Sequence, residues 1–237
     1  MIKFFRTIRK DLISENKTGK YLKYAIGEII LVVIGILIAL SINNWNEEIK
    51  NRAFEKEILE QIRANLIKDK LTLESIQANF ENAMNSTDKV LKSEWLTDER
   101  DSLKYWLSDI VRFDRFQPLT NAYEVAKSKG LDLISNKQLR FVIGAYYDDE
   151  IKRVVKAIED IEETFKEDWI YILRKDAKEF KFGQFLILKD TDILQGGGEM
   201  TNILRINKDN FNGGTISIKS GIKHIDRIIN LLDNELQ

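Results

Sequence analysis

One uninterrupted apolar stretch dominates the hydrophobic pattern of the chain. Ala25–Ile42 reads AIGEIILVVIGILIALSI, and Glu28 is its only charged residue. As a helix rising about 1.5 Å per residue, this stretch covers close to the ~30 Å hydrocarbon core of a bilayer. The pattern predicts a transmembrane helix over residues 24–43.

Two long segments after this stretch have helical periodicity. From Asn46 to about Leu91 there is no glycine or proline, and apolar residues recur mostly every three or four positions. We expect a stalk helix, residues 46–91, that continues out of the membrane. Apolar residues from Ile151 to Leu173 keep a spacing close to 3.5, which is typical of helices that pack lengthwise. The expected partner is the 46–91 helix, in antiparallel orientation.

Shorter helices are predicted between these two segments. Asp98 is placed to cap a helix that ends near Phe113. Thr120 or Asn121 opens the next helix, and Gly130 supplies its C-cap.

The rest of the chain extends the helical pattern. Ser135 with Gln138 has the spacing of a capping box that opens a further helix. Residues 181–200 are undetermined, except that the triglycine at 196–198 indicates a loop. Residues 200–208 and 216–236 are predicted to be helical. The fold class is therefore mainly all-α: a single transmembrane helix continuing into an antiparallel bundle of about five to seven helices.

The flanks of the apolar stretch favour insertion in one orientation. Tyr21, Tyr24 and Trp45 are placed as interface anchors, because aromatic rings prefer the headgroup layer. Residues 1–23 are a basic, amphipathic leader, and the positive-inside rule puts them in the cytoplasm. Residues 44–237 then form the extracytoplasmic domain. Two alternatives stay open: a cleaved signal peptide and a buried core helix of a soluble protein.

Glu28 has two interpretations. It lies about one turn inside the cytoplasmic boundary, so its side chain can reach headgroups or water at modest cost. Alternatively it faces a partner helix, because Gly27, Leu31, Gly35 and Ala39 share one helix face on which small residues permit close packing.

Composition excludes several kinds of chemistry. The chain has no cysteine, so thiol nucleophiles and disulfides are excluded. His224 is the only histidine, which leaves little for a zinc site or a catalytic triad. Charged residues make up 32% of the chain with a net charge of −1, a balance that argues against nucleic acid as a partner.

No catalytic, cofactor-binding or metal-binding residues are predicted, and no cofactor is expected. The acidic run at residues 148–150 lacks the alternating ligands of a calcium loop. Trp106, Phe116, Tyr146 and Tyr147 are candidates for an aromatic pocket, although such residues more often belong to a core.

Two stretches carry a family resemblance. The leader MIKFFRTIRK with SENKTGKYLKYAIGEIILVVIGILIALSINNWNEE, and the later FQPLTNAYEVAKSKGLDLISNKQLRFVIGAYYDDE, resemble the uncharacterised bacterial envelope family called domain-of-unknown-function family 6090. The resemblance implies a single-pass membrane protein of Gram-negative bacteria with no assigned activity. It offers no functional residues to transfer.

These observations favour a non-enzymatic scaffold or interaction protein in the bacterial inner membrane, with a periplasmic helical bundle. The expected partners are the lipid bilayer and a protein, including a second copy of the chain. The alternatives are a ligand or stress sensor that signals through the membrane helix and, less favoured, a hydrolase using two carboxylates.

Overall fold

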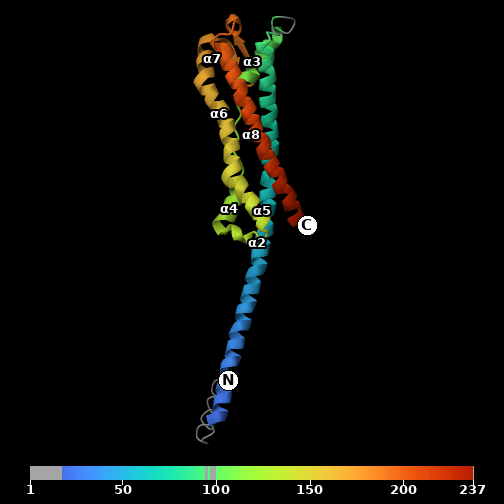
Figure 1. The fold of residues 1–237 in the computed structure, drawn as a ribbon, viewed down its shortest axis with the longest axis vertical. Helices are drawn as coiled ribbons and strands as arrows, with labels where there is room; N and C mark the ends of the chain where they lie inside the picture. The colour runs from blue at the N-terminus through green and yellow to red at the C-terminus, as the bar shows by residue number, and fades with distance from the viewer. Residues whose placement is uncertain (1–17, 94–95, 97–99, 237) are drawn as a thin grey trace. The chain divides into compact units, whose positions relative to one another are not determined.

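The computed structural model describes residues 18–93, 96 and 100–236, and it forms two compact units, Met1–Phe54 and Glu55–Gln237. It confirms the mainly all-α fold, with one small antiparallel hairpin as the exception (Figure 1). The leader before residue 18 and the predicted cap Asp98 lie outside the described residues.

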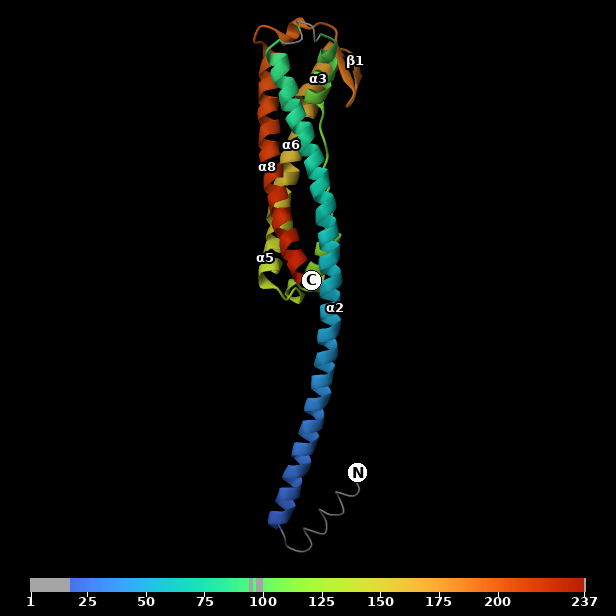
Figure 2. The ribbon, with the colours of Figure 1, turned by 90° about the vertical axis from the view of Figure 1, so that its right-hand side faces the viewer.

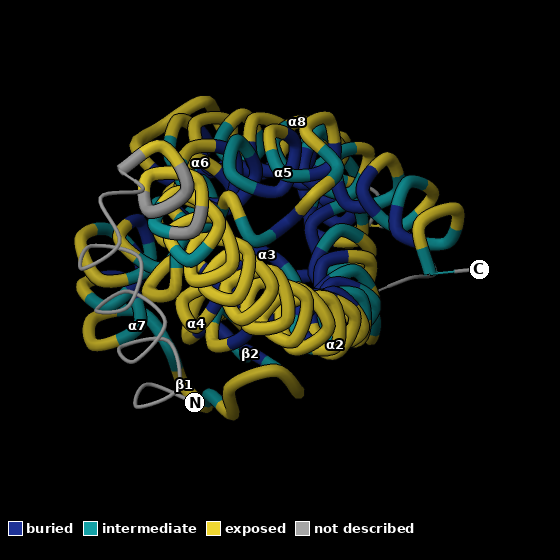
Figure 3. The backbone as a smooth tube through the Cα atoms, turned by 90° about the horizontal axis from the view of Figure 1, so that it is seen from below, coloured by how far each residue is buried: buried dark blue, intermediate teal, exposed yellow. Residues whose placement is uncertain are grey.

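The described part of the first unit is the N-terminal portion of helix α2 (Thr18–Leu91). Large apolar side chains from Ile29 to Ile42 are 46–68% exposed. Figure 3 colours this stretch of α2 as exposed. Within the described residues, α2 is the one helix that is long and apolar enough to cross a membrane.

The second unit contains the rest of α2 and all later elements. Its α-helices are α3 (Leu103–Val111), α4 (Asn121–Lys129), α5 (Lys137–Ala145), α6 (Ile151–Thr164), α7 (Ile170–Asp176) and α8 (Glu199–Glu235). Two π-helical segments, η4 (Tyr146–Glu150) and η5 (Phe165–Trp169), join α5, α6 and α7 into one helical run. Short 3₁₀ turns are η2 (Arg100–Ser102), η3 (Leu131–Leu133) and η6 (Asp192–Leu194). Strands β1 (Ala177–Lys181) and β2 (Phe185–Leu188) pair antiparallel.

α2 and α8 run antiparallel along the second unit (Figures 1 and 2). Four ion pairs show it, because residue numbers rise along α2 as they fall along α8: Arg63–Asp233, Lys70–Asp226, Glu81–Lys219 and Asp88–Lys208. All are at least partly exposed, so each stabilises the fold by no more than about 1 kcal/mol. Their main effect is to fix the register of the two helices.

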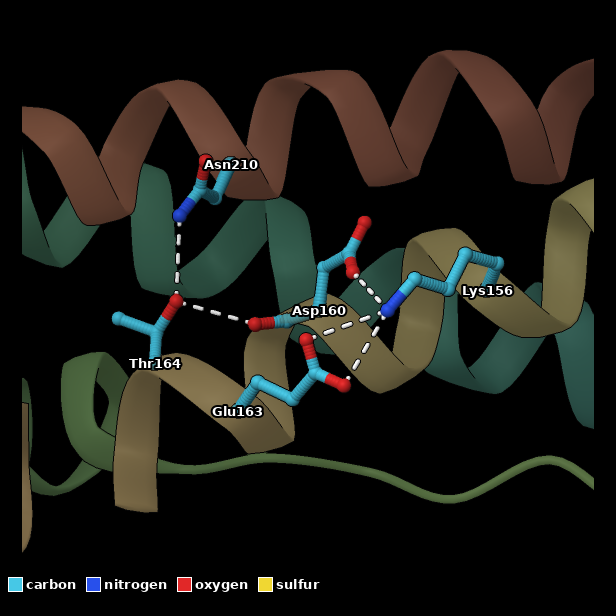
Figure 4. Close-up of polar contacts among 5 residues, drawn as sticks. All are labelled: Lys156, Asp160, Glu163, Thr164 and Asn210. Atoms are coloured by element: carbon cyan, nitrogen blue, oxygen red, sulfur yellow. Dashed lines mark hydrogen bonds and ion pairs between the residues drawn. The ribbon is translucent and has the colours of Figure 1, made fainter. Parts of the chain in front are cut away.

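The predicted partner of the 151–173 segment is wrong. α6 packs against α8, where added Cβ atoms at Gly221 and Gly214 would lie close to Val154 and the Ala157 carbonyl. Thr164 and Asn210 join the same two helices by a hydrogen bond (Figure 4). α6 is thus antiparallel to α8 and runs in the same direction as α2. Apolar periodicity identifies the buried face of a helix, but it does not specify which helix covers that face.

Residues 112–120 form an extended segment without regular secondary structure between α3 and α4. Asp114 accepts a hydrogen bond from the Asn79 side chain on α2 at 3.0 Å. Arg115 donates two hydrogen bonds to Glu162 on α6, at 2.9 and 2.8 Å. The segment therefore connects α2 to α6.

One predicted helix cap is wrong and another is confirmed. The side-chain oxygen of Asn136, not Ser135, caps α5 by accepting from the Leu139 N–H at 3.0 Å. Ser135 instead donates its N–H and hydroxyl to Glu55. Gly130 does end α4, with a φ of 105° that favours glycine.

The two helices predicted at 200–208 and 216–236 form one continuous helix, α8, which passes through Gly213 and Gly214. A Cβ at Gly214 would lie 2.7 Å from the buried ring of Phe80, so packing against α2 explains this glycine. Gly213 has open space around it.

Gly214→Ala is expected to destabilise the domain by about 1–2 kcal/mol, because the displaced Phe80 ring costs more than the gain in helix propensity. Gly213→Ala is expected to stabilise it by about 0.5–1 kcal/mol. Urea unfolding of both variants measures the difference. Equal effects at the two positions would show that Phe80 does not constrain α8.

Candidate functional site

A cavity of about 430 Å³ lies where η5 and α7 meet the start of α8. Its apolar lining residues include Ile172, Met200 and Ile203. Its acidic lining residues are Glu167, Asp168, Asp176 and Glu199. Lys175 is the one basic residue that lines it.

The π-helical segment η5 supplies two of these acids. Trp169 at its end is 1% exposed and joins the core cluster formed with α3, β2 and the start of α8. With this ring held in the core, Glu167 and Asp168 lie at the cavity. π-Segments inside α-helices are frequently found at functional sites.

The charges around the cavity are unbalanced. Within the described residues, none of the four carboxylates forms an ion pair with Lys, Arg or His. Glu199 stands in the first turn of α8, where an acidic side chain is favourable. Asp176 is the last residue of α7, at the negative end of a helix, where an acidic side chain is unfavourable.

A second polar group, Asp69 of α2, is buried where the extended segment 112–120 meets α2. Asp69 is 2% exposed, and within the described part of the chain its carboxylate accepts one hydrogen-bond donor, the Leu119 N–H, at 3.1–3.2 Å. Burial raises the pKa of Asp69 to about 6, although the Leu119 hydrogen bond opposes this shift. Burial also raises the pKa values of Tyr146 and Tyr147, and the nearby Asp69 adds to both shifts.

The four predicted pocket residues are all buried, but they do not form one group. Trp106 belongs to the core cluster that also contains Trp169, and Phe116 lies on the extended segment. Tyr146 and Tyr147 pack together, with ring centroids 5.0 Å apart. Among the described residues, the hydroxyls of these two tyrosines have no hydrogen-bond partner.

In the structure, Asp148 and Glu150 of the acidic run bind different partners. Asp148 accepts hydrogen bonds from Lys127 and Tyr123, at 2.7 and 2.8 Å, and these lower its pKa. Burial disfavours ionisation of Glu150, but Ser220, Arg153 and His224 together lower its pKa. This places the only histidine beside a buried acid, with 3.5 Å between Nδ1 of His224 and Oε1 of Glu150.

The membrane-span candidates all lie on α2. Glu28 is partly buried, and Gly27 and Gly35 have open space where a Cβ would stand. Ala39 is exposed, and the side chain of the anchor Trp45 is also exposed. The side chains of Tyr21 and Tyr24 lie outside the described residues.

Sequence reasoning missed Asp69 and the acidic cavity. Asp69 carries a detectable signal, because it follows Leu66 by three positions and precedes Leu73 by four, on the apolar face of α2. No comparable signal marks the cavity acids, which come from η5, α7 and α8.

The fold defines a helical-bundle protein with one candidate membrane-spanning helix near its N-terminus. The family of unknown function DUF6090 matches residues 28–172, and the chain belongs to that family. Neither a curated protein nor a solved structure matches the chain.

Proposed function

We propose that this protein is a single-pass, membrane-anchored interaction protein of the bacterial envelope, without catalytic activity. The observation that carries the proposal is the exposed apolar surface of α2 between Ile29 and Ile42. A contiguous apolar surface of this length is unfavourable in water and is covered by lipid or by another apolar helix. The basic leader favours a cytoplasmic N-terminus and a periplasmic domain.

The proposed partner is a second copy of the chain. Gly27, Leu31, Gly35 and Ala39 share one face of α2, and the open space at both glycines permits close approach of another helix. A symmetric pair places the same face of both copies in contact, as in most homodimers.

Disulfide cross-linking tests this proposal directly, because the chain has no cysteine of its own. Leu31→Cys and Ala39→Cys are expected to give covalent dimers of the full chain in native membranes. Leu37→Cys lies about 200° from Gly35 around the helix and is the matched control, for which little dimer is expected.

Equal cross-linking at all three positions would indicate random collision, and no cross-linking at any position would refute the second copy as partner. Topology is tested separately in spheroplasts with a membrane-impermeant maleimide. Glu159→Cys is expected to be labelled and Lys3→Cys protected, and the reverse pattern would refute the proposed orientation.

A second candidate function is sensing of a small ligand, which the cavity beside α7 favours. Such a ligand stabilises the folded state increasingly as its concentration rises above the Kd, so a thermal-shift screen with the full chain tests it. A screen without any ligand-dependent shift would count against this function.

A further inference from the structure

The cavity between α7 and α8 has the size and lining of a ligand site. Its volume of about 430 Å³ falls within the roughly 300–1,000 Å³ typical of such sites. Ile172, Met200 and Ile203 provide apolar contact area, and acidic side chains line the same cavity. This combination suits a molecule that has both an apolar part and a positive charge.

One of the acids around the cavity, Asp176, stands at an unfavourable helix position. Asp176 combines an unfavourable helix-end position with the neighbouring negative charges of Glu167 and Asp168. Lys175 is the one basic residue that lines the cavity, and within the described residues none of the four acids forms an ion pair with it or with another basic side chain. A bound cation would relieve the repulsion among these acids and would gain charge-assisted hydrogen bonds.

Tyr171 adds an aromatic face to the same site. It lines the cavity, and the residue is 61% exposed. The ammonium of Lys175 lies 5.8 Å from the centroid of this ring, so the face already accommodates a cation.

We propose that this cavity binds a small organic cation that carries an apolar group, such as an arylalkylammonium. The carboxylates of Glu167, Asp168 and Asp176 bind the ammonium group, and the apolar side chains of Met200 and Ile203 contact the apolar part. This site lies wholly within the second unit, and it does not depend on self-association of α2.

Calorimetric titration of the full chain in lipid nanodiscs tests the proposal, with empty nanodiscs as the blank. The cationic probes are phenethylammonium, benzyltrimethylammonium and butylammonium. The neutral 2-phenylethanol and the anionic 3-phenylpropanoate keep a similar skeleton without the positive charge. We expect saturable binding of the aromatic cations, weaker binding of butylammonium, and none of the neutral or anionic probes.

Charge-removing variants locate the site. The double variant Glu167→Gln, Asp176→Asn is expected to weaken phenethylammonium binding at least tenfold, as loss of hydrogen bonds to a charged group does. The matched control Asp149→Asn, Glu159→Gln removes two exposed acids elsewhere and is expected to leave affinity unchanged. Circular dichroism checks that both variants keep the parent fold.

Three results would overturn the proposal: no saturable binding of any cationic probe, equal binding of the neutral alcohol, or equal weakening in both double variants. Preferred binding of 3-phenylpropanoate would also overturn it and would point to the N-terminal amides of α8 instead. None of these results bears on the cross-linking of α2, so the two proposals fail independently.

Discussion

Replacing Ile34 and Leu37 with arginine is expected to remove the full chain from the membrane fraction. Both residues lie in the middle of the apolar stretch and are about half exposed. Each arginine at the centre of a membrane helix costs about 2.5–3.5 kcal/mol of insertion free energy. Together they cost about 5–7 kcal/mol, which is enough to prevent stable insertion. Carbonate extraction followed by immunoblotting measures the effect.

The control places the same two charges on the part of α2 that belongs to the second unit. Gln61→Arg and Thr72→Arg add arginines at exposed positions, and this variant is expected to stay in the membrane fraction. If the Ile34→Arg, Leu37→Arg chain resisted carbonate extraction as the parent does, residues 24–43 would not be the membrane anchor.

Asp69→Asn is expected to stabilise the protein at pH 7.5 by about 3 kcal/mol, because a pKa difference of one between the folded and unfolded states corresponds to about 1.4 kcal/mol. The pKa of Asp69 is raised from 3.8 to about 6 in the folded state, so the folded protein holds this proton more tightly than the unfolded chain. Asparagine has no charge to bury, and its side-chain oxygen can still accept the Leu119 N–H.

The pH dependence distinguishes this effect from a change in packing. Because the pKa of the Asp69 carboxyl is raised in the folded state, its contribution to the free energy of unfolding is fully present below pH 4 and is lost as the pH rises through about 6. The advantage of Asp69→Asn is therefore expected to vanish near pH 4 and to be complete above pH 7, in urea unfolding of the full chain. Asp149→Asn, at an exposed position, serves as the control. A constant difference across this pH range would show that the pKa of Asp69 is the same in the folded and unfolded states.

Much of the helical fold could be predicted from periodicity and turn chemistry. The end of α2 at Leu91 and the C-cap at Gly130 agree with expectation, because both depend on local backbone preferences. The cap of α5 was placed one residue too early, because Ser135 uses its hydroxyl for Glu55 on α2. That hydrogen bond joins residues distant in sequence, so it cannot be predicted from the residues next to Ser135.

The glycine pair in α8 is a second case in which tertiary contacts decide the outcome. Gly213 and Gly214 lie between the two helices predicted at 200–208 and 216–236, and glycine costs about 1 kcal/mol in a helix interior. The structure continues the helix, because Gly214 lets the Phe80 ring pack against the backbone. Tertiary packing here outweighs intrinsic propensity.

The sequence by itself determined the mainly α-helical class, the apolar stretch of α2 and the DUF6090 membership, because each depends on neighbouring residues along the chain. Only the tertiary structure decided that α6 packs on α8, that Asp69 is buried beside the Leu119 N–H, and that four acids line one cavity. The physical reason is that burial and electrostatic environment depend on which helices meet in space. Helical periodicity specifies the face that must be covered and leaves the partner open.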